Sequence, residues 1–295
     1  MKVRKEKSGI HFFERSNGLH LLLDEFENRL TDIDPSPRTV SIALTNRCDL
    51  KCHFCYAPKS KHELEFEYIK TLSAKLDKLG VLELTFGGGE PTLHPEFIEI
   101  CTWIWYNTRM GISVTTHGHH LNFEKINQLS GKLSSIRFSI DGLEPYYSSI
   151  RGRKLSDLLI IIGQVHGKIN FGINSVISTG RIKSTIDLLN MAISIGADNI
   201  LIIPEHKNGL FLLQSDEWVE LSEIIASYKD KIEIFITNDA SDKIINPTLE
   251  LSLPGEFLFA HISADKKLKK NSFDKSGIDI SSLADITADF LTLQT

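Results

Sequence analysis

Short apolar segments alternate with amphipathic segments six times between residues 39 and 228, and this alternation restricts the possible folds more than any other feature. The apolar segments are typical of buried strands and are Val40–Thr45, Val81–Phe86, Ile112–Thr116, Ser135–Ile140, Phe171–Ile177 and Ile200–Pro204. The segments that follow them have helical spacing and cover residues 63–79, 95–108, 122–129, 155–165, 184–195 and 215–228. Consecutive strand–helix units form a parallel sheet with right-handed crossovers, so the sequence predicts an α/β protein.

Six units are fewer than the eight that close a barrel, and we therefore expect a partial (βα)6 TIM-like barrel. A doubly wound sheet is the alternative fold. Within the barrel, we expect Ser184 to cap its helix at the amino end and Gly196 to end that helix.

Weaker signals flank the alternating region. Before it, apolar-rich residues 10–14 and 19–24 surround Asn17-Gly18, the strongest short signal for a hairpin turn, and residues 34–37 read as a linker. After it, the sequence predicts a strand at 232–236, a hairpin over 257–273 and a closing helix within 280–295. We therefore divide the chain into an N-terminal hairpin and linker (1–38), a barrel (39–230) and a C-terminal extension (231–295).

Charge and hydropathy exclude several classes of protein. The chain has 33 basic and 38 acidic side chains and a formal net charge of −5, so we expect no nucleic-acid partner. The longest apolar run, Leu158–Ile162, is far too short to span a membrane, and no apolar signal-peptide stretch follows the charged N-terminus. We expect a cytoplasmic protein. Four lysines are expected to protect an edge strand or, alternatively, to line the rim of an anionic site: Lys266, Lys267, Lys269 and Lys270.

Three of the four cysteines lie within eight residues, directly after the first predicted barrel strand. Clustered thiols in a reducing compartment indicate a metal or redox site, and Cys48, Cys52 and Cys55 could hold three irons of a [4Fe–4S] cluster. The fourth iron would then be open to a bidentate small molecule. The alternative is a zinc site completed by His53 or a distant His, although zinc sites usually use C-x2-C pairs. Cys101 lies in an apolar helix and is expected to be a core residue.

The C-x3-C-x2-C spacing, with Phe54 before the last Cys, resembles the radical S-adenosylmethionine (SAM) superfamily over roughly residues 39–205. The resemblance implies one [4Fe–4S] cluster whose open iron binds SAM. Reduction of the cluster by a flavodoxin- or ferredoxin-type donor then cleaves SAM to methionine and a 5′-deoxyadenosyl radical, which removes a substrate hydrogen.

The loops after the next two strands also resemble this family. Gly88, Gly89 and Glu90 match a Gly-Gly-Glu-Pro motif that cradles the SAM amino group in the family. Thr116 and His117 stand where relatives often read Thr-Asn-Gly, so His117 departs from the pattern. His119 and His120 complete a three-His loop, which is either a solvated loop or a substrate-contacting or proton-transferring one.

The remaining loops supply further expected contacts. By the same resemblance, Ser139, Asp141 and Arg151 match a Ser-x-Asp-Gly…Arg-Gly stretch whose Ser and Arg contact the SAM carboxylate in the family. The alternative is that Asp141 is an ordinary turn residue and Arg151 a surface charge. Asn174 would face the SAM ribose or be a hydrogen-bonded core residue. Further expected contacts are Phe54 and Tyr56 beside adenine, with Glu205 and His206 as substrate contacts or surface-loop residues. The candidates for catalysis are His117, Glu205 and His206.

The substrate is the least determined property. Residues 257–279 resemble a hairpin that carries auxiliary-cluster cysteines in peptide-modifying relatives, but Asn271 stands where such a Cys is expected and no Cys follows Cys101. We therefore expect no auxiliary cluster. The resemblance favours a peptide or natural-product tailoring enzyme. The alternatives are a radical SAM enzyme acting on a nucleotide or sugar, and a non-catalytic SAM- or cluster-binding sensor or partner protein.

Overall fold

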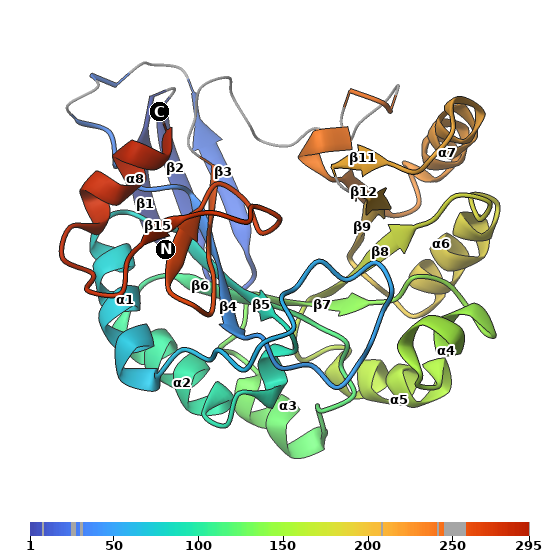
Figure 1. The fold of residues 1–295 in the computed structure, drawn as a ribbon, viewed down its shortest axis with the longest axis horizontal. Coiled ribbons are helices and arrows are strands. Elements are labelled where there is room, and N and C mark those ends of the chain that lie inside the picture. The colour runs from blue at the N-terminus through green and yellow to red at the C-terminus, as the bar shows by residue number, and fades with distance from the viewer. Residues whose placement is uncertain are drawn as a thin grey trace.

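A ten-stranded sheet organises the computed structural model, which describes residues 1–7, 9–24, 28–29, 32–207, 209–240, 242–244 and 258–294 (Figure 1). The strand order is β12-β9-β8-β7-β6-β5-β4-β13-β14-β15, and neighbours run parallel from β12 to β13. The parallel strands are β4 (Thr39–Thr45), β5 (Glu83–Gly88), β6 (Gly111–Thr116), β7 (Ser135–Ser139), β8 (Phe171–Ile177), β9 (Asn199–Pro204), β12 (Glu233–Ile236) and β13 (Phe259–Ile262). The predicted six-unit barrel is confirmed, and the sheet stays open in the described part of the chain because β12 and β13 are not paired with each other.

Helices cover the outer face of this sheet, as Figure 1 shows. They are α1 (Phe66–Lys78), α2 (Phe97–Asn107), α3 (Phe123–Leu129), α5 (Leu155–Val165), α6 (Ser184–Ser194) and α7 (Ser215–Tyr228), with a short α4 (Tyr146–Arg151) between β7 and α5. The expected cap at Ser184 is wrong: α6 begins at Ser184 itself, its N-cap is Lys183, and the Ser184 hydroxyl donates to the Arg181 carbonyl.

The two faces of the central strands differ in chemistry. On the helix side, alternate apolar residues such as Phe86, Val114 and Phe138 are almost completely buried and form the core. On the other face, the small polar residues Thr85 and Ser139 are only half-buried. The inner face therefore offers room and hydrogen-bonding groups, while the helix side supplies the hydrophobic stabilisation.

An antiparallel sheet of β1 (Lys2–Glu6), β2 (Gly9–Glu14) and β3 (Leu19–Leu23) packs at the amino ends of the parallel strands. The predicted hairpin corresponds to β2 and β3, with Phe13 fully buried against Gly111. The sequence did not indicate β1, because this strand buries Lys2, Arg4 and Glu6 and exposes the apolar Val3.

Glu6 explains this reversed pattern. Arg38 donates to both of its carboxylate oxygens (2.8 and 2.5 Å), and Arg4 and His11 contact Oε1 at 3.2 and 3.3 Å. A buried charge needs such partners, so this cluster attaches the N-terminal sheet to the segment that enters the barrel.

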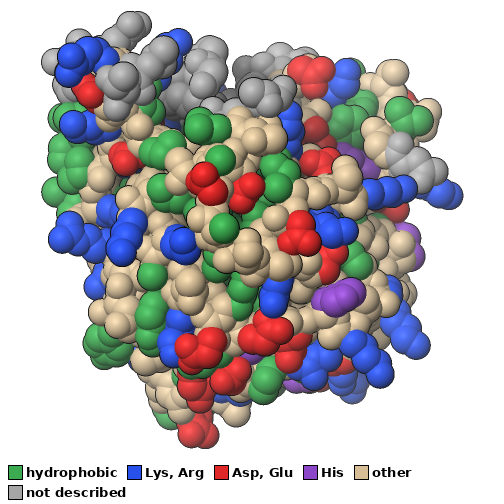
Figure 2. Space-filling model, turned by 60° about the vertical axis from the view of Figure 1, so that its left-hand side comes forward, with side chains coloured by type: hydrophobic (Ala, Val, Ile, Leu, Met, Phe, Trp, Pro, Cys, Tyr) green, Lys and Arg blue, Asp and Glu red, His purple; other side chains and the backbone are tan. Residues whose placement is uncertain are grey.

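The C-terminal extension adds strands at the other edge of the barrel. β13 is followed by the antiparallel β14 (Lys267–Lys269) and β15 (Ile278–Asp279), and the chain closes with α8 (Ile286–Gln294). The predicted hairpin is therefore confirmed within the described residues, Phe257 lying outside them. The expected edge protection by lysines is wrong, because β15 covers β14, and Lys269 is buried. On the face that Figure 2 presents, acidic and basic side chains are interspersed.

Candidate functional site

The cysteine loop, residues 46–62, connects β4 to the segment before α1 at the carboxyl edge of the parallel sheet. Cys48 and Cys52 are half-buried, Cys55 is exposed, and all three are free thiols. The Cys55 N–H donates to the Cys52 carbonyl at 3.2 Å, which places these two residues on one turn. Burial raises the pKa of the Cys48 and Cys52 thiols. By contrast, Cys101 is completely buried in α2, as expected for a core residue.

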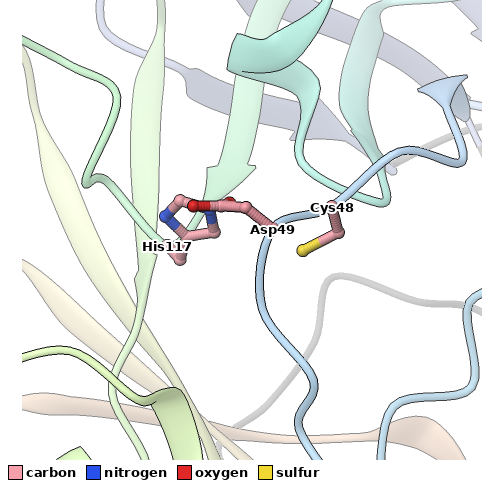
Figure 3. Close-up of side chains that lie close together, drawn as sticks. All are labelled: Cys48, Asp49 and His117. Carbon is pink, nitrogen blue, oxygen red and sulfur yellow. The ribbon is translucent and has the colours of Figure 1, made fainter.

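Asp49 fixes the cysteine loop to two other loops. Its Oδ1 accepts a hydrogen bond from His117 at 3.0 Å, and its Oδ2 lies 2.7 Å from Arg153 Nη2 and 3.1 Å from His120 Nε2. Figure 3 shows the Asp49 carboxylate against the His117 ring, with Cys48 beside it on the same loop. Burial opposes ionisation, but the contacts with His120, His117 and Arg153 outweigh it and lower the pKa of Asp49 to about 2.

His117 is part of this attachment and is not a solvated loop residue, so that expectation is wrong for it. Its ring is buried, and Nδ1 accepts a hydrogen bond from the His119 backbone N–H at 3.2 Å. Nε2 therefore carries the proton and donates to Asp49. His119 meets the Tyr147 hydroxyl at 2.9 Å, and burial lowers the pKa of His119 to about 4.

Glu90 lies in the buried interior of the loop after β5. The Thr92 N–H (3.1 Å) and the hydroxyls of Thr92 and Thr116 (2.5 Å each) donate to Oε1. The His117 backbone N–H donates to Oε2 at 2.9 Å. Protein groups therefore bind both oxygens of this carboxylate, with three hydrogen bonds to Oε1 and one to Oε2, and Thr116 is part of the same network.

The glycines of this loop have different roles. A Cβ on Gly88 would lie 2.5 Å from the Thr45 carbonyl oxygen, and one on Gly89 would overlap the Arg47 carbonyl. These two glycines therefore let the β5 loop lie directly against the start of the cysteine loop. A Cβ on Gly87 would meet nothing within 4 Å, so Gly87 is the position that faces open space. The three-glycine run was the available signal, but it did not separate the three roles.

A buried ion pair joins the loop after β7 to the end of α4. Arg151 Nε and Nη2 lie 2.7 and 2.6 Å from Asp141 Oδ2, and Asp141 Oδ1 accepts the Val176 N–H at 3.1 Å. The guanidinium also lies 5.8 Å from the centre of the Phe54 ring. The alternative of a turn residue and a surface charge is therefore wrong: both side chains are buried, and they face the cysteine loop.

Ser139 and Asn174 are direct partners across β7 and β8, so the register brings these two expected residues together. Asn174 is half-buried, and its Oδ1 accepts from Arg137 Nε. Arg137 also donates to Asn199 Oδ1 at 2.7 Å and to the Ile173 carbonyl at 3.1 Å. The Asn174 carboxamide therefore belongs to a polar network on the inner face of the sheet.

The other expected residues lie across the carboxyl edge, around the C-terminal extension. Tyr56 packs on Phe273 with ring centres 4.4 Å apart, and Phe273 stacks on His206 at 5.8 Å. Glu205 lies 3.4 Å from His53 Nε2. Phe54 and Tyr56 thus point to different neighbours. The sequence offered no signal for Phe273, whose position depends on the hairpin that carries it.

A second group of possible metal ligands occurs among the described residues. One ligand atom each from Cys48, Asp49 and His117 lies within 4.8 Å of the others. It would use only one of the three clustered thiols and would need to break the Asp49–His117 hydrogen bond. The donor set of the full loop, three thiols from eight residues, suits an iron–sulfur cluster better.

Comparison with known proteins supports this assignment. The sequence profile described as the radical SAM superfamily matches residues 42–206. The sporulation killing factor maturation protein SkfB of Bacillus subtilis is 33% identical over 123 residues, covering 40% of this chain and only 30% of SkfB. A probable GTP 3′,8-cyclase of Saccharolobus solfataricus is 26% identical over 227 residues, covering 72% of this chain and 69% of that relative.

The fold is shared with solved structures. Streptococcus suis SuiB bound to its precursor peptide SuiA superposes with a TM-score of 0.74 at 13% identity, over 94% of this chain and 84% of SuiB. Within the described residues, the helices are too short or too polar to cross a membrane. The profile matches more than half of the chain, over the strands and loops that carry the cysteines, the glycines and the Asp141–Arg151 pair. This protein is therefore a member of the radical SAM superfamily, whose enzymes use a [4Fe–4S] cluster and S-adenosylmethionine.

Proposed function

We propose that Cys48, Cys52 and Cys55 hold one [4Fe–4S] cluster and that this enzyme cleaves SAM reductively to remove a hydrogen atom from its substrate. The observation that carries the proposal is the position of three free thiols in one loop at the carboxyl edge of the sheet, where Phe54 of that loop lies against Arg151 of the Asp141–Arg151 pair. Active sites of parallel α/β barrels form at this edge.

The residues around the loop fit SAM in chemistry. Arg151 uses Nε and Nη2 on Asp141, which fixes the plane of the guanidinium, while Nη1 makes no hydrogen bond within the described residues. A guanidinium oriented in this way can bind a carboxylate. Ser139 offers a hydroxyl at the end of β7, and Gly87 lets a ligand approach the backbone of the β5 loop. We assign these three residues to SAM, with Asn174 and Phe54 at its margin.

When bound and reduced, the cluster supplies the electron that splits SAM into methionine and a 5′-deoxyadenosyl radical. The protein's own residues position the two cofactors. Asp49 holds the cysteine loop against the His117 loop, and Gly88 and Gly89 hold it against the β5 loop. Glu90 acts as a positioning residue through the Thr116–His117 network. Fixing three loops in this way limits the motion of a reactive centre.

For the substrate, a peptide is the first choice. SkfB is named as a maturation protein, and SuiB is solved with a precursor peptide. A nucleotide is the second choice, because a match over 72% of this chain is to a probable GTP 3′,8-cyclase. A substrate carrying deuterium at the reacting carbon transfers it to 5′-deoxyadenosine, so mass spectrometry of that product separates the two.

Cluster assembly tests the cysteine assignment directly. After anaerobic reconstitution, the wild-type chain should contain about four irons and four sulfides and show the visible absorption of a [4Fe–4S] cluster. Cys48→Ala, Cys52→Ala and Cys55→Ala should each lose most of this iron, whereas Cys101→Ala should keep it. A colourless protein that binds one zinc, or retained iron in all three variants, would overturn the assignment.

A further inference from the structure

The cysteine loop has a charge opposite to that of the rest of the chain. Residues 46–62 contain four basic residues and one acidic residue, whereas the chain carries a net charge of −5. The four basic residues are Arg47, Lys51, Lys59 and Lys61, and we refer to them as the basic collar. The one acidic residue, Asp49, is turned toward His117, His120 and Arg153 of neighbouring loops and forms an ion pair with Arg153.

The collar lies on the surface next to two of the thiols. Lys51, Lys59 and Lys61 are exposed, and Lys59 Nζ lies 3.5 Å from Cys55 Sγ. An open cavity of about 620 Å³ is lined by Asn46, Arg47, Cys48, Lys59, Ser60, Lys61 and Glu63. Within the part of the chain that the structure describes, these lining residues come from the loop and the residue after it, and none comes from the inner face of the sheet.

This placement separates two approaches to the cysteines. On one side, Phe54, which lies between Cys52 and Cys55 in the sequence, faces the Arg151 guanidinium at 5.8 Å, near the residues assigned to SAM. On the other side, Cys48 and Cys55 are reached through the basic collar. A substrate and SAM would occupy the first approach, so the second stays available to a partner that never enters the sheet.

We propose that the basic collar docks an acidic electron-donor protein, and this inference rests on the proposed function. The donor gives up one electron, which the oxidised cluster held by the three cysteines would accept, and no covalent bond is made or broken between the partners. Charge complementarity selects the partner: a protein with a negative face is attracted to the collar and repelled by the acidic remainder of the chain. Among the described residues that line the cavity, Glu63, which pairs with Arg47 at 2.5 Å, is the one acidic residue that opposes the collar.

The test is a charge reversal measured with two reductants. Lys51→Glu and Lys61→Glu, combined, reverse two exposed collar charges without touching a thiol or the residues assigned to SAM. Lys78→Glu reverses a single exposed charge at the far end of α1, at the opposite edge of the sheet, and serves as the control for added negative charge away from the collar. A purified acidic flavodoxin serves as the binding probe, and its dissociation constant for the full chain is measured by calorimetry at low and high salt.

We expect the double variant to bind the flavodoxin about tenfold more weakly than wild type at low salt, and this difference to shrink at high salt. Lys78→Glu should bind as wild type does. With cluster and SAM loaded, 5′-deoxyadenosine formation driven by photoreduced flavodoxin should fall in the double variant, while formation driven by dithionite should not change.

Equal flavodoxin affinity in the double variant and wild type would overturn the docking proposal, and so would an equal loss with both reductants. Absence of 5′-deoxyadenosine from wild type with dithionite has a different meaning. It would contradict the proposed function, while the flavodoxin binding measurement, which needs no turnover, would still decide the role of the collar.

Discussion

Replacing Glu90 by Gln separates a structural role of this carboxylate from a direct contact with SAM. The carboxylate is 1% exposed and accepts four hydrogen bonds, from Thr92 (N–H and hydroxyl), Thr116 and the His117 backbone. Gln keeps one acceptor oxygen but replaces the other with an amide nitrogen, which brings donors against donors. A hydrogen bond to a charged group contributes about 1.5–3 kcal/mol, and a buried donor left unsatisfied costs about 1–3 kcal/mol.

We therefore expect Glu90→Gln to lower the free energy of unfolding by about 2–4 kcal/mol with neither SAM nor cluster present. Urea unfolding of the metal-free protein at neutral pH measures this. Glu67→Gln is the matched control, because that carboxylate is exposed and, among the described residues, pairs only with Lys70 on the same helix. This substitution should cost less than about 0.5 kcal/mol. If Glu90→Gln unfolds at the wild-type urea concentration but binds SAM tenfold more weakly, the carboxylate faces the ligand and our interpretation is wrong.

Three further predictions follow from individual contacts. Burial opposes ionisation of Glu6, but the contacts with His11 and Arg38 outweigh burial and lower the pKa of Glu6 to about 2. The ionised carboxylate therefore stabilises the fold fully above about pH 4.5, and this stabilisation is lost as the pH falls toward 2. This stabilisation amounts to about 3 kcal/mol. The difference in urea midpoint between wild type and Glu6→Gln should therefore shrink from pH 6 to pH 3. A difference that stays constant over this range would contradict the role given to the Glu6 carboxylate. Gly89→Ala should reduce iron incorporation, because the added Cβ would overlap the Arg47 carbonyl. The control is Gly163→Ala in α5, where the added Cβ would lie in open space. This variant should retain full iron content and melt no lower than wild type. Cys101→Ala should lower the melting temperature through a small core cavity and leave iron content unchanged.

The sequence predicted the barrel well because its strands and helices have clear periodicity. Phe171–Ile177, Leu155–Val165 and Ser215–Tyr228 have the same bounds in the sequence analysis and in the structure. β1 shows where periodicity fails. Its buried positions are charged, and their partners, such as Arg38, lie far away in the sequence, so no local pattern could reveal them.

The sequence predicted only part of the site, because local patterns place residues on loops but do not show how those loops contact one another. The sequence placed the cysteines, the glycines and Arg151 at one edge, because each follows a strand. It did not reveal that Asp49 holds His117, or that Glu90 is enclosed by Thr92 and its neighbours, because those contacts depend on how loops from different strands meet. Asp49 lies inside the cysteine motif, yet nothing in its position indicated an inward orientation.

Cys48, Cys52 and Cys55 are proposed to support reductive cleavage of SAM. The most direct measurement is 5′-deoxyadenosine formed by the anaerobically reconstituted protein with dithionite and SAM. We expect the wild type and Cys101→Ala to form it, and the Cys48→Ala, Cys52→Ala and Cys55→Ala variants to form none. If a complete cluster assembles and SAM binds, but no 5′-deoxyadenosine forms with or without peptide and nucleotide substrates, the protein is a binding protein and the account is contradicted.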